Sequence, residues 1–192
     1  MQADYAVELG RDDPVLQLPW SAPDGGPRHY DLKRHPELVA DIAEAVCVPE
    51  LGEFLAAINA PTSQLESAKC DAWSSSEMDA DEDIFAAARK FGSYVDLVLG
   101  GNERFSFAAH EKLAKRLTEL LHGVPEIPAQ AEFIVRRAGF EDGQEVRRGF
   151  YLTFYLFGYG PDEARARQQW AIALKLVQTA IGQVFHQMPS SV

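Results

Sequence analysis

The stretch that decides the fold is GFYLTFYLFGYG, Gly149–Gly160, the most apolar run in the chain. Side chains alternate between the two faces of a β-strand, so a strand here would present two different rows. One row is entirely apolar and consists of Phe150, Leu152, Phe154 and Leu156. The other carries hydroxyl groups and consists of Tyr151, Thr153, Tyr155 and Tyr159, with Phe157 among them. The run therefore predicts a buried strand, and it leaves open what the hydroxyl-bearing second face contacts.

A similar run, GSYVDLVLGG, occurs earlier in the chain at Gly92–Gly101. Aligning the two runs places Tyr94 on Tyr151. Each run follows another strand-like segment and precedes an amphipathic helix, so the order strand–strand–helix occurs twice, over residues 64–124 and 130–186. A single ββα unit cannot bury its own sheet face, whereas two such units can share one sheet. The sequence therefore predicts an internal repeat.

The repeated order predicts an α+β fold. Residues 64–192 would form a four-stranded antiparallel sheet with two helices on one face, in the manner of a circularly permuted ferredoxin-like fold, which is an architectural analogy and not a family assignment. That arrangement puts the two apolar strands, 93–99 and 149–157, in the centre of the sheet. Residues 1–63 would form an N-terminal helical extension made of loop and two short helices.

Helical periodicity and capping residues place the individual helices. The N-terminal extension contains two of them, at 36–47 and after Pro49. Three more are expected at 79–92, 106–123 and 161–186. The segment before residue 36 is rich in Pro, Gly and Asp, which predicts a loop after one short strand in YAVEL, residues 5–9.

Packing the apolar rows under the helices leaves a second set of side chains on the opposite face, here called the tyrosine face. The central strands contribute Tyr94, Asp96, Val98, Tyr151, Thr153 and Tyr155 to it. The outer strands add Lys69, Asp71, Trp73, Glu132, Ile134 and Arg136. In the second hairpin, the turn predicts that Ile134 pairs with Tyr151. The candidate ligand or interface residues are Trp73, Tyr94, Asp96, Arg136, Tyr151, Thr153 and Tyr155.

The tyrosine face is too apolar for a plain solvated surface and too polar for a simple core, so three interpretations stay open. Residues 1–63 could fold over it and complete the core with paired polar groups. A second copy of the chain could cover it as a homodimer, because Tyr, Trp and Arg are enriched at interfaces. A small-molecule ligand could bind among the rings and convergent polar groups. In each case, we expect the rings to be withheld from bulk water.

The function expected from these features is a non-catalytic cytoplasmic binding or protein-interaction module that uses the tyrosine face. The alternative is a small hydrolase or transferase in which Asp71 or Asp96 is the acid/base and Arg136 holds an anion. Asp96 is the better of the two carboxylates, since desolvation on a central strand would raise its pKa. The same position equally suits a structural hydrogen bond to Tyr151 or Tyr155.

Metal and phosphate motifs fail on spacing. Asp79, Asp81 and Asp83 resemble the start of a calcium loop, but Ile84 stands where the sharp turn needs glycine and Lys90 where the bidentate acid is due. No histidine pair has the i, i+4 spacing of a helical zinc site. Acidic residues follow the glycines of FGYGPDEAR, which disfavours a phosphate there. We therefore expect no metal site, and no cofactor is indicated.

Composition narrows the remaining classes. The chain has 192 residues, of which 46% are hydrophobic, and a formal net charge of −11. Such a charge repels a phosphate backbone, so no nucleic-acid partner is expected. We expect no signal peptide and no membrane partner, because no run approaches the ~20 apolar residues of a membrane span. The two widely separated cysteines, Cys47 and Cys70, fit free thiols in a cytoplasmic protein.

Overall fold

The computed structural model of the chain describes residues 1–22, 25–26, 28–78, 87–143 and 145–187. Its strands are β1 (Gln2–Val7), β2 (Val15–Leu18), β3 (Leu65–Ser75), β4 (Arg89–Leu99), β5 (Ala129–Asp142) and β6 (Glu145–Gly160). Its α-helices are α1 (Ala43–Cys47), α2 (Pro49–Ile58), α3 (Phe107–His122) and α4 (Glu163–Gln187). Short 3-10 helices, η1 (Pro36–Asp41) and η3 (Gly101–Phe105), precede α1 and α3. The fold is α+β, as the sequence predicts.

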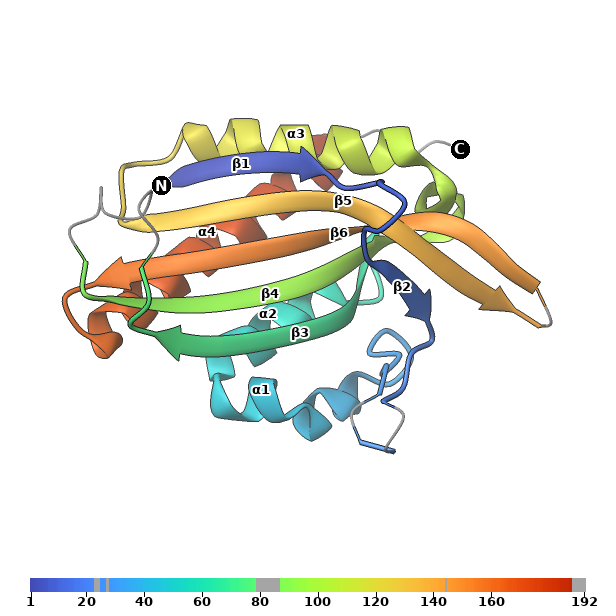
Figure 1. Ribbon diagram of the computed structural model, residues 1–192, viewed down its shortest axis with the longest axis horizontal. Helices are drawn as coiled ribbons and strands as arrows, with labels where there is room; N and C mark the ends of the chain where they lie inside the picture. The colour runs from blue at the N-terminus through green and yellow to red at the C-terminus, as the bar shows by residue number, and fades with distance from the viewer. Residues whose placement is uncertain (23–24, 27, 79–86, 144, 188–192) are drawn as a thin grey trace.

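All six described strands form one mixed open sheet in the order β1-β5-β6-β4-β3, with β2 also paired to β5 (Figure 1). The expected centre of the sheet is confirmed, because β4 and β6 are adjacent and antiparallel between β5 and β3. The four strands of residues 64–192 are antiparallel neighbours, as predicted. The sheet as a whole is not four-stranded and antiparallel, however, because β1 and β2 add to β5 in parallel. The prediction of an N-terminal helical extension is also wrong, because two strands of the sheet, β1 and β2, precede the helices of residues 36–58.

The long strand β5 offers the same edge to both N-terminal strands. β5 has 14 residues, whereas β1 has six and pairs only with residues 130–135 of it. The part of the β5 edge that β1 leaves unpaired, residues 137–140, takes β2. Arg137 donates to the backbone carbonyls of Leu9 and Gly10, which holds the connection between β1 and β2 close to β5.

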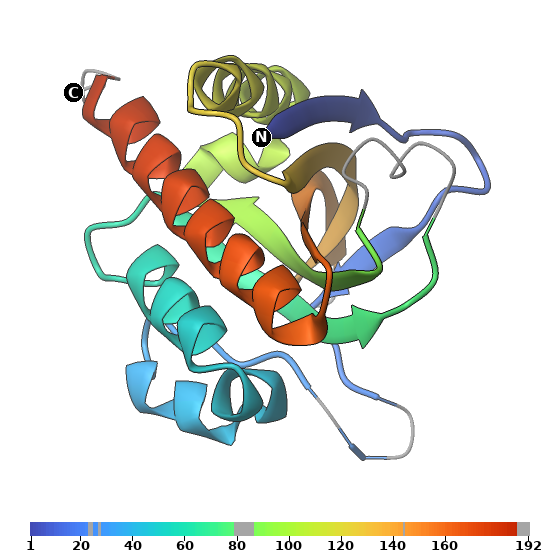
Figure 2. The ribbon, with the colours of Figure 1, turned by 90° about the vertical axis from the view of Figure 1, so that its left-hand side faces the viewer.

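The main core lies between one sheet face and α2, α3 and α4, which Figure 2 shows together on one side of the sheet. Trp170 of α4 is fully buried there, and its Nε1 donates to Ser93 Oγ at 2.8 Å. A Cβ atom on Gly158 would lie 2.2 Å from the Trp170 backbone nitrogen. Glycine at 158 therefore allows α4 to pack directly on β6.

The helices follow from local signals in some places and depart from them in others. The Ser106 side chain accepts from Ala109 N and caps α3, as expected. The single helix expected at 36–47 is wrong, because Ile42 adopts an extended conformation between η1 and α1. Val46, within the same segment, is 62% exposed.

The helix expected at 79–92 is wrong over residues 89–92, which begin β4, while 79–86 lie outside the described residues. Tertiary packing favours the strand: Phe91 packs on the Trp170 ring with centroids 4.9 Å apart. The expected register of the second hairpin is also wrong by two residues, because Tyr151 pairs with Arg136. A shift of two preserves the alternation, so the assignment of side chains to faces is unaffected.

Candidate functional site

The tyrosine face lies opposite the helices and is crossed by the N-terminal chain at one end. β2 pairs with the β5 edge, and two residues later Trp20 reaches β3, where its Nε1 donates to the Ala68 carbonyl at 2.7 Å. In Figure 1 the chain passes in front of β5 and β6 just before β2, and β2 lies beside the β5–β6 hairpin, near the ends of β4 and β3. One part of the face is covered in this way and another part stays open.

The covered end forms a second, smaller core. Leu16, Leu18 and Trp20 pack there against Ala68, Val98, Phe105, Ala138, Phe140 and Tyr151. Tyr151 is consequently buried, whereas Trp73, Tyr94 and Tyr155 keep partial exposure. The first interpretation, a cover made by the N-terminal segment, thus describes this end of the face and not its whole length.

A chain of hydrogen bonds crosses the middle of the tyrosine face. Thr153 and Asp96 are paired across β6 and β4, and the Thr153 hydroxyl donates to Asp96 Oδ1 at 2.8 Å. Thr153 Oγ1 accepts from Arg136 Nη1 at 3.0 Å. Arg136 Nε donates in turn to Glu8 Oε2 at 2.7 Å. The network joins β4, β6 and β5 to the residue that follows β1.

Burial changes the acid–base properties of this network. It raises the pKa of Asp96 from 3.8 to about 6, against the opposing effects of the Thr153 hydrogen bond and the Arg136 charge. It also raises the pKa of Tyr151 to about 12. For Arg136, burial is the largest single influence and would lower the pKa, but the interactions with Glu8 and Tyr155 together raise it. At neutral pH the network therefore holds a charged Arg136 and a neutral Tyr151 phenol beside the Asp96 carboxyl group.

A cavity of about 340 Å³ lies over Asp96, between β2 and the floor of the sheet. Its lining consists of Pro14, Val15, Leu16, Lys69, Tyr94, Asp96, Arg136, Tyr151 and Tyr155. Ligand pockets typically span about 300–1,000 Å³ and combine aromatic walls with a few polar groups. This cavity, here called the roofed cavity, has both properties and is near the lower end of that size range.

Pro14, Val15 and Leu16 form the roof of this cavity. Beyond the roof, the open end of the tyrosine face carries a strip of aromatic rings. Tyr94, Tyr155, Phe157 and Trp73 follow one another, with neighbouring ring centroids 5.8, 6.4 and 6.1 Å apart. A Cβ atom on Gly92 would lie 2.9 Å from both the Trp73 and the Phe157 rings. The strip therefore depends on glycine at this position of β4.

The seven residues selected from the sequence all lie on this face, but they divide into two groups. Asp96, Arg136, Tyr151 and Thr153 meet at the roofed cavity together with Tyr94 and Tyr155, whereas Trp73 lies in the open strip. Of the two carboxylates, Asp96 is in the network, while the Asp71 carboxylate accepts from Ala72 N.

Sequence reasoning missed the roof and the partner of Arg136. Glu8 gave no signal because it reaches Arg136 only through the pairing of β1 with β5. The sequence does contain a weak signal for β2, since VLQL at Val15–Leu18 is a short strand-like run between two prolines. Arg147, on the same hairpin as Arg136, lies over the Phe105 ring at 3.9 Å and is not part of the site.

The described residues give little support for a metal centre or a cysteine nucleophile in this region. Among the described residues, no group of three or more His, Cys, Asp or Glu side chains is placed to hold a metal ion. Burial raises the pKa of the Cys70 thiol to about 12, so this cysteine is a poor nucleophile. Within the described part of the chain, no helix is both long and apolar enough to span a membrane.

Comparison of the chain with protein-family models, with curated proteins and with solved structures finds no match.

Proposed function

We propose that this protein is a binding module that takes a small ligand in the roofed cavity on the tyrosine face. The observation that carries the proposal is the position of Asp96, a buried carboxylate that lines a cavity beneath a strand that crosses over it. Burial of a charged group costs free energy, so a site of this kind needs a partner for the charge. Thr153 supplies one hydrogen bond, which leaves acceptor capacity on the carboxylate.

The lining residues favour a ligand that combines a flat or apolar body with polar groups. Tyr94 and Tyr155 offer ring faces, and Asp96 accepts hydrogen bonds. Arg136 is already paired with Glu8, so an anionic ligand would have to share it. A ligand that donates to Asp96 and stacks on the tyrosine rings is the best fit.

Three aromatic probes that differ mainly in charge test the proposal: 2-phenylethylamine, 3-phenylpropan-1-ol and 3-phenylpropionate. We expect calorimetry to show saturable binding of at least one of the two hydrogen-bond donors, the amine or the alcohol, by the wild type. Val15 of β2 lines the cavity and is 47% exposed, whereas Val146, near the start of β6, is 56% exposed and does not line it. Val15→Trp should therefore abolish binding, and Val146→Trp should preserve it. The proposal is wrong if neither donor binds at millimolar concentration, or if both variants behave alike.

One observation favours a second candidate, a small hydrolase or transferase. A carboxyl group whose pKa is about 6 can take or give a proton near neutral pH, and Asp96 has that property. Turnover of p-nitrophenyl acetate or p-nitrophenyl phosphate by the wild type, lost in Asp96→Asn, would favour the enzyme. Equal rates for the two proteins would favour the binding module.

The open aromatic strip suits a protein partner, including a second copy of the chain. Trp73 and Phe157 keep partial exposure beyond the roof, and interfaces are enriched in such residues. If the strip forms a homodimer, Trp73→Glu should convert a dimer into a monomer in light scattering. Cytoplasmic location is part of the same proposal, and the two free cysteines support it.

The internal repeat also belongs to this proposal. Two strand–strand–helix units, β3-β4-α3 and β5-β6-α4, contribute their helices to the same core, which supports a duplicated ββα unit in a ferredoxin-like arrangement. Superposition of residues 64–122 on 130–186 tests it, and a different placement of the helix relative to its strands in the two units would count against it.

A further inference from the structure

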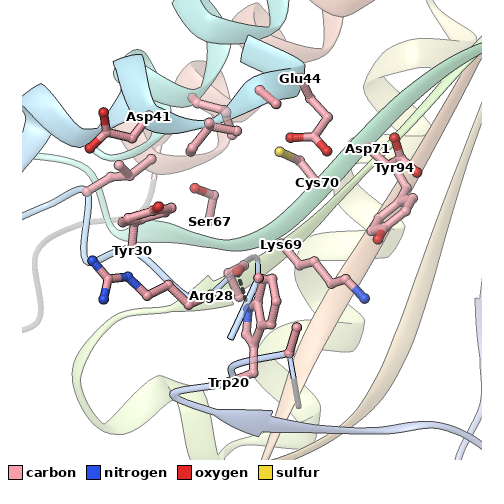
Figure 3. A pocket seen from close by; sticks show the side chains of 17 residues that line it. Trp20, Arg28, Tyr30, Asp41, Glu44, Ser67, Lys69, Cys70, Asp71 and Tyr94 are labelled. Carbon is pink, nitrogen blue, oxygen red and sulfur yellow. Dashed lines mark hydrogen bonds between the residues drawn. The ribbon is translucent and has the colours of Figure 1, made fainter. Parts of the chain in front are cut away.

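A second and larger recess, of about 590 Å³, lies along β3, the last strand in the order of the described sheet. Figure 1 shows α1 and the chain after β2 projecting past this strand. Figure 3 looks into the recess, with β3 running behind the side chains. Asp41 and Glu44 lie on one side of the strand, and Trp20, Arg28 and Lys69 on the other. The recess therefore has a strand edge as its floor.

The alternation of hydrogen bonds across the sheet tells which backbone groups of β3 face this recess. Tyr159 N donates to Pro128 O, so odd-numbered residues of β6 bond to β5 and even-numbered residues bond to β4. The registers of β6 with β4 and of β4 with β3 extend this alternation of hydrogen bonds to β3, the edge strand. Cys70, Ala72 and Ser74 consequently direct their N–H and C=O groups away from the sheet.

The beginning of this edge is capped by side chains. Asn59 Oδ1 accepts from Ser67 N, and Asn59 Nδ2 donates to Ser67 Oγ. At the β-bulge that follows, the Trp20 indole donates to the Ala68 carbonyl. Capping and bulges are common means of blocking an exposed strand edge. Here they block residues up to 68.

The edge beyond the bulge is open. The outward N–H of Ala72 is held by the carboxylate of the adjacent Asp71, at 2.7 Å. In the part of the chain that the structure describes, no hydrogen bond reaches the outward backbone groups of Cys70 or Ser74. Unpaired groups of this kind form a template on which an extended peptide can add as a further strand.

The charges on the two sides of the recess specify the side chains of such a peptide. A residue paired with Cys70 would project to the same side as the Cys70 thiol, which points toward Glu44 in Figure 3. Its neighbours would project to the other side, toward Arg28 and Lys69. Asp71 also lies on that side, but its carboxylate already accepts from the backbone. Basic residues therefore suit the alternate peptide positions whose side chains point toward Glu44. Acidic residues suit the positions between them, whose side chains point toward Arg28 and Lys69.

We propose that the open edge of β3 binds an extended peptide segment of a partner protein in which basic and acidic residues alternate. The walls exclude a second copy of the chain from this position, because α1 and the residues after β2 project past β3 and would obstruct another sheet. This site is distinct from the roofed cavity, although Lys69 and Tyr94 line both.

Fluorescence anisotropy of two labelled peptides of equal composition tests the charge pattern. KEKEKE can present one charge sign to each side of the recess, whereas the block sequence KKKEEE cannot. We expect the alternating peptide to bind roughly ten-fold tighter, since several cross-strand charge pairs contribute. Glu44→Gln should weaken its binding about three-fold, while Glu119→Gln, an exposed acid on α3 that makes the same change in net charge, should have no effect.

Backbone methylation of the peptide tests the strand pairing without altering the protein. Only alternate residues of an added strand direct their N–H groups to the edge. N-methylation of either all lysines or all glutamates should therefore abolish binding, and methylation of the other set should preserve it. The proposal is overturned if the two methylated peptides bind alike, or if KEKEKE binds no better than KKKEEE.

Discussion

The Thr153 hydroxyl on β6 donates a 2.8 Å hydrogen bond to Asp96 Oδ1 on β4, and both side chains are buried on the face of the sheet away from the helices. The same oxygen of Thr153 accepts from Arg136. Thr153 thus links the buried carboxylate by hydrogen bonds to the Arg136–Glu8 ion pair. The predictions below follow from this arrangement and from the packing that surrounds it.

Replacement of Thr153 by valine should destabilise the protein by about 1–3 kcal/mol, because it leaves a buried carboxylate without its donor. The free energy of unfolding at pH 7, from urea denaturation, measures the effect. Thr179→Val is the matched control, since Thr179 is exposed on α4 and its hydroxyl donates to the Lys175 carbonyl of the same helix. Equal losses in the two variants would contradict the assignment of Thr153 to the buried network.

Asp96→Asn should remove a pH dependence of stability. The pKa of Asp96 is raised to about 6 in the folded chain from 3.8, so the folded state holds a proton that the unfolded state releases between these values. The stability of the wild type should therefore fall as pH rises through this window, by an amount on the order of 3 kcal/mol from this group. Urea denaturation at pH 3.5 and 7.5 should show the asparagine variant more stable than the wild type only at the higher pH. A variant less stable than the wild type at pH 7.5 would refute this.

Gly158→Ala should be strongly destabilising, by more than about 3 kcal/mol, because the added Cβ would lie 2.2 Å from the Trp170 nitrogen and 2.4 Å from the Ala166 carbonyl oxygen. Gly182→Ala in α4 is the control: a Cβ there meets nothing within 4 Å, so alanine should stabilise the helix by about 0.5–1 kcal/mol. Thermal denaturation separates the two. A tolerated alanine at 158 would mean that α4 does not pack this closely on β6.

The comparison of sequence and structure shows which features local patterns determine. The alternation in Gly149–Gly160 placed Tyr151, Thr153 and Tyr155 on one face correctly, because strand geometry alone fixes it. The two-residue error in the hairpin register left this face assignment correct, because a shift of two residues preserves the alternation. Apolar content also identified the two central strands, since buried strands tolerate few polar residues.

Features that depend on distant parts of the chain could not be predicted in this way. β2 pairs with the part of β5 that extends beyond β1, and residues 15–18 carry only a weak signal of their own. Lys90 and Phe91 lie in a segment with helical composition, yet they form a strand because Phe91 packs on Trp170. The cavity and the recess likewise arise where the N-terminal chain crosses the sheet, which no local periodicity reports.

The ring resonances of the tyrosines provide the most direct test of the claim that the roofed cavity binds a ligand. In the chain with ring-labelled tyrosine, titration with 2-phenylethylamine or 3-phenylpropan-1-ol should shift the signals of Tyr94, Tyr151 and Tyr155, which line the cavity, with one common saturation curve. The signal of Tyr5, exposed on β1, should not move. Shifts that never saturate, or that are as large for Tyr5 as for the three cavity tyrosines, would contradict the proposal.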